Sequence, residues 1–344
     1  MRFPEYSAPH LAPATSVGLV MRRVVYAVVP GAAVMALLFG WGVLLNMLLA
    51  VTTALICEAL MLRLRGRPTG PYLRDCSAVL AALLLALALP PLLPWWITVL
   101  GVAFGLIFGK HLYGGLGFNP FNPAMVGYVV LLISFPREMT LWPAPAFIGG
   151  TGPDLWQTLV YVFSGHFPDQ LQFDAISRAT PLDEVRVRLG QDESLQAIRS
   201  GPAFGTLGAH GWEWINLLFL AGGLWLLRRR VIGWQIPVGV LTGIAVPALL
   251  FSLTGPDQYP GVAFHLLAGG AMLGAFFIAT DPVSAATTPR GRLYYGLGIG
   301  ILTWVIRTWG GYPDGIAFAV LLMNMAAPLI DQYTRPRIHG RGSE

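Results

Sequence analysis

Charge is scarce in this 344-residue chain: 11% of the residues are Asp, Glu, Lys or Arg, whereas 55% are apolar. Soluble domains carry about 25% charged residues, so the composition excludes a soluble globular enzyme. Lysine occurs once, as Lys110, and the only cysteines are Cys57 and Cys76. Two cysteines cannot build the disulfide framework of a small secreted fold, and the high apolar content excludes a disordered chain.

Long apolar runs take the place of charge. The mean hydropathy is +0.62, and a membrane-spanning helix needs roughly 20 mostly apolar residues. Ten runs between charged or Pro/Gly-rich breaks are candidate spans: 24–40, 42–62, 77–90, 95–109, 124–136, 213–227, 231–252, 261–280, 293–307 and 314–330. We therefore expect an all-α integral membrane protein of about ten transmembrane helices, some of them broken or short.

The basic residues indicate an orientation. If the N-terminus is cytoplasmic and the spans alternate, most of the 22 basic residues fall on the cytoplasmic side, including the Arg228–Arg230 cluster. This distribution follows the positive-inside rule and places both termini in the cytoplasm. The pI of 9.4 therefore reflects topology, and we expect no nucleic-acid partner.

One long polar segment, residues 137–212, interrupts the apolar pattern. Its length exceeds an ordinary connection between neighbouring spans, so we expect it to carry function, on the periplasmic side. An odd number of spans in each half would make any internal duplication inverted. The expected organisation is a cytoplasmic tail (1–23), a five-span half (24–136), the periplasmic region (137–212), a second five-span half (213–330) and a cytoplasmic tail (331–344).

Two Asn-Pro pairs occur in GGLGFNPFNPAMVGY, residues 114–128. A residue before proline is driven out of helical dihedrals, which predicts either a kinked connection with capping asparagines or a broken helix. In the second case Asn119 and Asn122 would line a cofactor or ion path.

A second turn sequence is ATDPVSAATTPRGR, residues 279–292. Asp281 is either an end cap or the start of a half-helix whose amides could bind an anion.

Glu58 and His265 lie inside predicted spans, where ionisable residues are costly and therefore candidates for function. For Glu58, a reach to Arg63 or Arg65 at the interface is the simpler explanation, and His265 is more simply a neutral, hydrogen-bonded residue.

The polar region contains DAISRATPLDEVRVRL, residues 174–189. Pro181 suits the first position of a helix, which makes Thr180 a plausible N-cap of a short charged helix. This local interpretation does not explain why the element lies in a periplasmic region.

Four stretches of the sequence together carry a resemblance to a known family: DCSA at 75–78, GFNPFNPAMVGY at 117–128, DAISRATPL at 174–182 and TDPVSAATTPRG at 280–291. The chain resembles the RnfD family over essentially its whole length. Members of this family are a membrane component of the Rnf (Rsx) ion-translocating electron transport complex. In that family a Ser/Thr-Gly-Ala-Thr motif receives FMN from a flavin transferase, as a phosphoester on the final threonine. The resemblance implies covalent FMN on Thr180, with Ser177 and Ala179 as motif neighbours. Arg178 replaces the glycine, and would either hinder the transferase or pair with the phosphate.

The resemblance further implies a multi-pass subunit in a bacterial inner membrane, with the other complex subunits and lipid as partners. The complex would transfer electrons between NADH and ferredoxin, coupled to Na⁺ or H⁺ translocation, and this subunit would not be catalytic alone. Asn119, Asn122 and Asp281 would line a central cavity. Whether a second, non-covalent flavin is held stays open. The alternative is a secondary transporter or channel without a redox cofactor.

Overall fold

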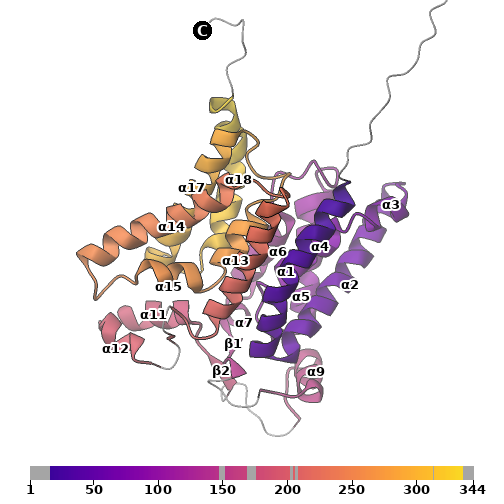
Figure 1. Cartoon of the computed structure of the whole chain (residues 1–344). Helices are drawn as coiled ribbons and strands as arrows, with labels where there is room; N and C mark the ends of the chain where they lie inside the picture. Colours follow the sequence, from indigo (N-terminus) through magenta and orange to yellow (C-terminus); the bar gives the residue numbers. More distant parts are fainter. Residues whose placement is uncertain are drawn as a thin grey trace, which may run out of the picture.

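The computed structural model describes residues 16–146, 152–168, 176–201, 204–205, 208–312 and 314–335. Its first half is a bundle of helices, followed along the chain by a short outer segment (Figure 1). The elements of this half are α1 (Val17–Phe39), α2 (Trp41–Leu64), α3 (Thr69–Leu73), α4 (Ser77–Ala86), α5 (Trp95–Leu106), the π-helix η1 (Ile107–His111), α6 (Pro123–Ser134) and α7 (Pro136–Thr140).

The second half is also helical, and its third span is discontinuous. Its elements are α13 (Trp212–Arg228), α14 (Gln235–Thr254), α15 (Val262–Leu267), α16 (Ala271–Leu273), the π-helix η2 (Gly274–Ile278), α17 (Pro289–Trp309) and α18 (Ile316–Tyr333). Between the halves lie β1 (Trp142–Pro143), α9 (Leu155–Ser164), β2 (Ser177–Arg178), α11 (Pro181–Leu189) and α12 (Leu195–Arg199). Within the described ranges, the chain departs from the expected all-α fold at the two-residue strands β1 and β2.

Each of the ten predicted spans contains at least one of these helices. Of the helices described, α1, α2, α14 and α18 are long and apolar enough to cross a membrane, and 95–111 and α6 are shorter apolar helices. The chain is thus a largely helical membrane protein, and the full count of ten spans stays a prediction. The expectation of short or broken spans is met in the eighth, where residues 268–270 separate α15 from α16.

Glycine shapes the bundle at two places. Gly40, with φ of +79°, ends α1 and lets the chain reverse into α2, a conformation that costs other residues energy. Between α14 and α17, a Cβ added to Gly300 would clash with the carbonyl oxygen of Val240. Small residues at such a crossing allow the backbones of two membrane helices to approach closely.

The two halves are joined through buried polar contacts as well as apolar packing. Asn122, at the start of α6, donates a side-chain hydrogen bond to the carbonyl oxygen of Ile278 in η2 at 3.1 Å. Its backbone N–H donates to Oδ1 of Asn324 in α18 at 3.0 Å, and Nδ2 of Asn324 donates to the hydroxyl of Tyr295 at 2.6 Å. Buried polar groups rarely stay unpaired, so these bonds fix the register of one half against the other.

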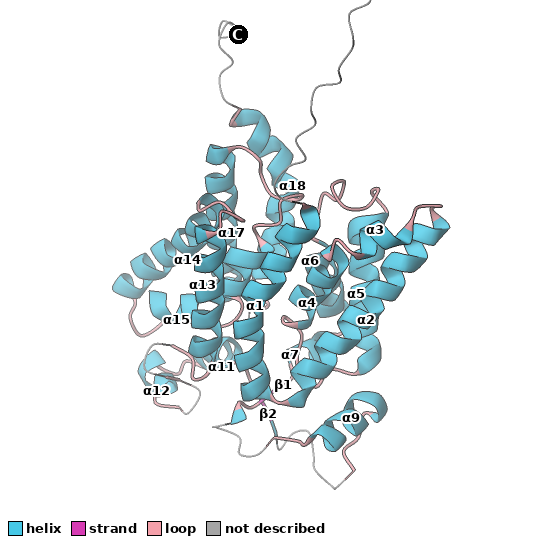
Figure 2. Ribbon diagram, turned by 45° about the vertical axis from the view of Figure 1, so that its right-hand side comes forward, coloured by secondary structure: helices cyan, strands magenta, loops and turns pink. Residues whose placement is uncertain are grey.

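The segment between the halves is anchored at one end of the bundle (Figure 2). Strand β1 pairs antiparallel with β2, with Trp142 opposite Arg178 and Pro143 opposite Ser177. The Trp142 ring packs against Phe39 at the end of α1 and against Trp212 at the start of α13, with centroids 5.6 and 5.2 Å apart. This aromatic cluster fixes the strand pair to both halves.

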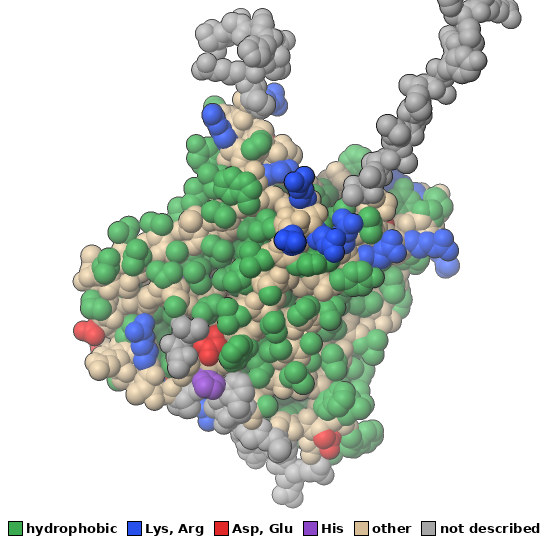
Figure 3. Space-filling model, in the orientation of Figure 1, with side chains coloured by type: hydrophobic (Ala, Val, Ile, Leu, Met, Phe, Trp, Pro, Cys, Tyr) green, Lys and Arg blue, Asp and Glu red, His purple; other side chains and the backbone are tan. Residues whose placement is uncertain are grey.

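Arginines gather at the opposite end of the bundle (Figure 3). We call this end the arginine face and the end with β1, β2, α9, α11 and α12 the loop face. The separation agrees with the charge asymmetry predicted from the sequence. The arginines of the arginine face are Arg22, Arg23, Arg63, Arg65, Arg67, Arg74, Arg228, Arg229, Arg230, Arg290, Arg292 and Arg335.

Candidate functional site

Thr180 lies at the loop face, immediately before α11. It has extended dihedrals (φ −63°, ψ 154°), its Oγ1 accepts the backbone N–H of Asp183, and Pro181 follows at the first helical position. The predicted N-cap is therefore confirmed, and it explains why a short, highly charged helix begins here. Because the N–H···Oγ1 contact is 3.3 Å long and the residue is only half-buried, the hydroxyl is accessible for chemistry.

The residues before Thr180 are held by the strand pair. Ser177 and Arg178 form β2, and the backbone N–H of Ala144 extends the pairing by donating to the carbonyl of Ile176 at 2.8 Å. Arg178 and Ala179 are exposed, and Ser177 is half-buried. Arg178, the last residue of β2, lies two residues before Thr180. Residues 169–175, which include the start of the motif, lie outside the described ranges.

An apolar cavity of about 90 Å³, which we call the Thr180 cavity, opens beside the hydroxyl. It lies between the two halves, and its walls include Tyr128, Trp142, Trp212, Gly270 and Asp314. Ligand pockets usually measure roughly 300–1,000 Å³. The Thr180 cavity is therefore smaller than an ordinary ligand pocket.

The charge environment of Thr180 is mixed. The first turn of α11 carries Asp183 and Glu184, and its last turn carries Arg186 and Arg188. Burial raises the pKa of the Asp183 carboxyl above its ordinary value, and the nearby Arg186 offsets part of the rise. Glu184 and Glu193 form ion pairs with Arg188 at 3.0 and 2.6 Å, so α11 is stabilised by local charge pairs.

A second cavity, of about 560 Å³, lies toward the arginine face. We call it the asparagine cavity; its walls include Ser77, Lys110, Asn119, Asn122 and Asp281. Nδ2 of Asn119 donates to the carbonyl of Phe121 at 3.0 Å, but its buried Oδ1 has no partner among the described residues. A buried acceptor without a donor is unusual and suits a ligand that donates an N–H.

Asn122 and Asp281 have structural partners. Besides bonding Ile278, the Asn122 side chain caps α6 by accepting the N–H groups of Ala124 and Met125. The segment 114–122 is thus a connection with a capping asparagine, and the alternative of a broken helix is not observed there. Asp281 accepts the N–H of Val283 and the hydroxyl of Ser284. Of the two alternatives for Asp281, the cap is therefore observed and the half-helix is not, because the next helix begins at Pro289.

The sequence suggested that Glu58 reaches Arg63 or Arg65, but the structure gives it other partners. Its carboxylate accepts two hydrogen bonds from Lys110, at 2.8 and 2.9 Å, and lies 2.9 Å from Nε2 of His111. These partners come from η1, about 50 positions along the chain, so spacing alone could not reveal them. An ionised carboxylate with 1% exposure requires such pairing.

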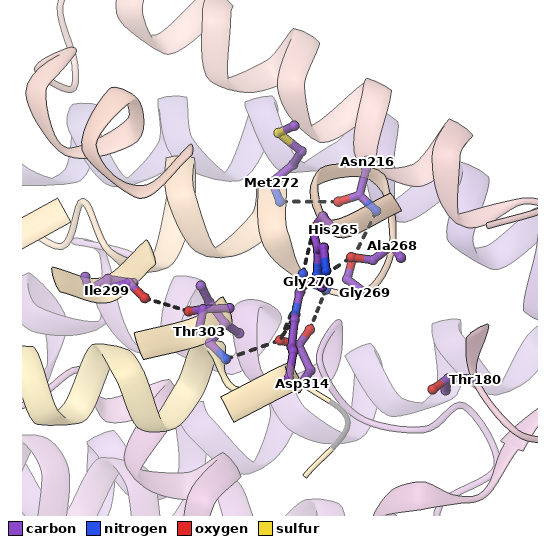
Figure 4. Close-up of polar contacts among 12 residues, drawn as sticks. Thr180, Asn216, His265, Ala268, Gly269, Gly270, Met272, Ile299, Thr303 and Asp314 are labelled. Carbon is purple, nitrogen blue, oxygen red and sulfur yellow. Dashed lines mark hydrogen bonds and ion pairs between the residues drawn. The ribbon is translucent and has the colours of Figure 1, made fainter. Parts of the chain in front are cut away.

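A buried polar network at the break between α15 and α16 was not predicted (Figure 4). Arg307 of α17, 5% exposed, donates to the carbonyls of His265 and Ala268 and pairs with Asp314 at 3.1 Å. Asn216 of α13 donates to the Leu267 and Gly269 carbonyls and accepts from Met272. These Asn216 contacts are 3.0, 3.0 and 3.2 Å long. An arginine at the end of an apolar run was the available signal.

The predicted site residues therefore fall into two groups. Thr180, Ser177 and Arg178 lie together at the loop face, beside the Thr180 cavity. The other three, Asn119, Asn122 and Asp281, line the asparagine cavity toward the arginine face. The arrangement offers a half-buried threonine hydroxyl at one end of the bundle and a ligand-sized cavity at the other.

Comparison with known proteins gives matches over nearly the whole chain. A model of the NQR2, RnfD, RnfE family matches residues 5–340. Three relatives, each named as the D subunit of an ion-translocating oxidoreductase complex, come from Alcanivorax borkumensis, Pseudomonas paraeruginosa and Escherichia fergusonii. The first is 52% identical over 339 residues, covering 98% of this chain and 96% of that protein. The others are 53% and 49% identical, covering 99% of this chain and 96% and 99% of those proteins.

Proposed function

The chain belongs to the NQR2, RnfD, RnfE family, as its motifs predicted, and on this premise we propose that it is the flavin-carrying membrane subunit of an Rnf-type ion-translocating oxidoreductase complex. Relatives that match over nearly their full length are named as the D subunit of an ion-translocating oxidoreductase complex. The observation that carries the proposal is the position of Thr180: a half-buried hydroxyl, in the motif Ser-Arg-Ala-Thr, positioned at the loop face by the helix cap and the adjoining strand pair.

In this proposal FMN is joined to Thr180 by a phosphoester, and a flavin transferase installs it. Esterification leaves Oγ1 able to accept the Asp183 N–H, so the helix cap survives the modification. A phosphate at this position also lies at the start of α11, where the helix dipole favours negative charge. When bound, FMN supplies the redox chemistry, and the protein supplies the tether, the orientation and the surrounding charge.

Arg178 is proposed to pair with this phosphate. Its side chain is exposed and lies two residues before Thr180, and arginine recognises phosphate through two parallel hydrogen bonds. The backbone of Arg178 is paired with β1, and its side chain is exposed. A transferase can therefore approach the motif. The arginine is therefore compatible with attachment at a position where the family motif has glycine.

A second, non-covalent flavin is proposed in the asparagine cavity. The cavity volume of about 560 Å³ lies within the usual range for ligand sites. The unpartnered Oδ1 of Asn119 could accept the ring N–H of an isoalloxazine. Asn122 and Asp281 would shape the wall, because their own polar atoms are engaged.

The membrane placement follows from the two faces. We propose that the arginine face is cytoplasmic and the loop face periplasmic, in a bacterial inner membrane. The covalent flavin would then exchange electrons with neighbouring subunits on the outer side. The whole complex would couple electron transfer between NADH and ferredoxin to Na⁺ or H⁺ translocation.

A secondary transporter or channel is the competing function. Discontinuous helices in transporters expose backbone groups to the transported ion. Here the carbonyls of Leu267, Ala268 and Gly269 accept from Asn216 or Arg307. The break is therefore capped by side chains of the protein itself, which favours a structural role over an ion site.

In-gel fluorescence tests the proposal. The protein, produced with its flavin transferase and denatured, should give a fluorescent band under ultraviolet light. Thr180→Val should abolish the band and Thr180→Ser should retain part of it. Thr158→Val, which changes a buried threonine of α9, is the matched control and should leave the band unchanged. A band that survives Thr180→Val, or no band from the unmodified chain, would refute attachment at Thr180.

A further inference from the structure

Four hydrogen-bonded side chains run from the asparagine cavity to His111 in the first half. Lys110 Nζ donates to Ser77 Oγ at 3.0 Å and to both carboxylate oxygens of Glu58 at 2.8 and 2.9 Å. Nε2 of His111 lies 2.9 Å from Glu58 Oε2. The four residues come from α2, α4 and η1, so the chain of contacts depends on tertiary packing.

The π-helical turn η1 makes this cluster possible. Lys110 and His111 are consecutive, yet both side chains contact the same carboxylate. Consecutive residues of an α-helix point about 100° apart. A π-helix changes this geometry locally, and such turns are frequent at functional sites. The backbone N–H of Leu112 donates to the carbonyl of Ile107 at 2.8 Å, which closes the wide turn.

The cluster has two distinct ends. At one end, Ser77 and Lys110 line the asparagine cavity, and the Ser77 hydroxyl, which accepts from Lys110, makes no donor contact within the described residues. At the other end, Nδ1 of His111 is buried and has no partner in the described part of the chain. The guanidinium of Arg65, an exposed residue of the arginine face, donates to the His111 carbonyl at 3.2 Å, so the backbone at this end contacts that face.

We propose that Ser77, Lys110, Glu58 and His111 form a proton relay from water at the arginine face to a redox ring in the asparagine cavity. This inference rests on the second flavin of the proposed function, because a reduced isoalloxazine takes up protons. The relay explains why the Ser77 hydroxyl has no acceptor for its proton, and why Nδ1 of His111 has no partner, among the described residues. A purely structural ion pair explains neither feature.

Each step of the relay moves one proton between neighbouring groups. Ser77 would supply its hydroxyl proton to a bound ring when a neighbouring centre of the complex supplies the electrons, and Lys110 would return a proton to Ser77. Lys110 regains its proton through Glu58, which receives the Nε2 proton of His111. His111 takes a proton from water at Nδ1 as it gives one up at Nε2. In sum, one proton moves from water to the ring, and only O–H and N–H bonds break and form.

A matched control lies at the other side of the molecule. His265 of α15 is also buried, at 4% exposure, and its Nδ1 is likewise unpartnered among the described residues. It lines a separate cavity beside α11, and it has no contact with Glu58 or Lys110. His265→Gln therefore reports the general effect of replacing a buried histidine, whereas His111→Gln keeps a donor for Glu58 and removes the imidazole ring.

The experiment measures proton uptake by the purified complex during flash photoreduction, with a pH indicator in weak buffer and flavin absorbance recorded together. His111→Gln should slow proton uptake at least tenfold, with flavin content and thermal stability retained, and His265→Gln should match the unmodified complex. Glu58→Gln is the second variant; it should slow proton uptake likewise, with lower thermal stability because it leaves the buried Lys110 without its anion. If neither variant folds, a several-fold slowing of uptake in deuterated water by the unmodified complex is expected.

Uptake at the normal rate in the folded variants, or no solvent isotope effect, would overturn the relay while leaving both flavins in place. Failure of the second-flavin proposal is distinguishable, because acid denaturation of the unmodified complex would then release no flavin from this subunit. That result would overturn the relay as well, since the ring it serves would be missing. The covalent flavin on Thr180 is measured separately and is independent of both results.

Discussion

The side-chain amide of Asn122 donates a hydrogen bond to the carbonyl oxygen of Ile278 at 3.1 Å, which joins the start of α6 to the last residue of η2. The first residue belongs to the first half of the chain and the second to the other half. The same asparagine caps α6 through Oδ1. One residue of an Asn-Pro pair thus ends a connection, starts a helix and couples the two halves.

Replacement of Asn122 by alanine should lower stability without directly removing a ligand contact. The change leaves the Ile278 carbonyl and two N–H groups of α6 without partners, at a cost of about 1–3 kcal/mol for each buried group left unsatisfied. Thermal unfolding in detergent measures the effect. Asn119→Ala is the control: it removes one bond to Phe121, so it should destabilise less but release the non-covalent flavin. Equal destabilisation by the two variants would contradict this division of roles.

Arg307 should be essential for the broken third span of the second half. Arg307→Gln leaves Asp314 and two backbone carbonyls without their cation, and breaking a buried ion pair costs about 3–5 kcal/mol. Arg186→Gln is the comparison, because this residue loses one surface bond to the Gly311 carbonyl, worth about 0.5–1.5 kcal/mol. Similar unfolding temperatures for both variants would show that the network does not hold the break.

Trp142 should couple the flavin motif to the bundle. Trp142→Ala removes the ring that packs on Phe39 and Trp212, and large-to-small changes of buried aromatics cost about 3–5 kcal/mol. We expect faster proteolysis of the loop face and less covalent flavin. Trp156→Ala in α9, where the side chain is 67% exposed, should change neither. Normal flavin content in Trp142→Ala would mean that the transferase does not need the anchored strand pair.

Asp183 should make the stability of the loop face depend on pH. Burial raises the pKa of its carboxyl, so the folded state binds the proton more readily than the unfolded state. The stabilisation is fully present below the unfolded pKa, about 3.9, and is lost as the pH rises through the folded value. Asp183→Asn should therefore stabilise α11 at pH 7, and the gain should vanish toward pH 4. A gain independent of pH, in thermal unfolding curves, would contradict the assignment.

The local features of the sequence were predictive. Thr180 and Pro181 marked a helix start, and the structure has an N-cap and α11 at that point. The apolar runs located helices in all ten predicted spans, because burial in lipid demands continuous apolar segments. Span lengths were less accurate: the third run, 77–90, contains α4, which ends at Ala86.

Long-range partners could not be predicted. Glu58 was matched with the nearest arginines, but it pairs with Lys110 and His111, since packing and not spacing brings η1 beside α2. Asn216 was missed because a single asparagine in an apolar run carries no pattern. Arg307 is the last residue of the predicted span 293–307, and its position in the sequence did not reveal that its side chain lies within the bundle.

The masses of two adjacent tryptic peptides, from the protein produced with a flavin transferase, would locate the covalent flavin. Trypsin cleaves after Arg137, Arg178 and Arg186, so Ser177 falls in peptide 138–178, and Thr180 is the only hydroxyl residue of peptide 179–186. We predict that peptide 179–186 carries the added mass of one FMN less one water and that peptide 138–178 is unmodified. An unmodified 179–186 peptide, or FMN on 138–178, would contradict the assignment of the flavin to Thr180.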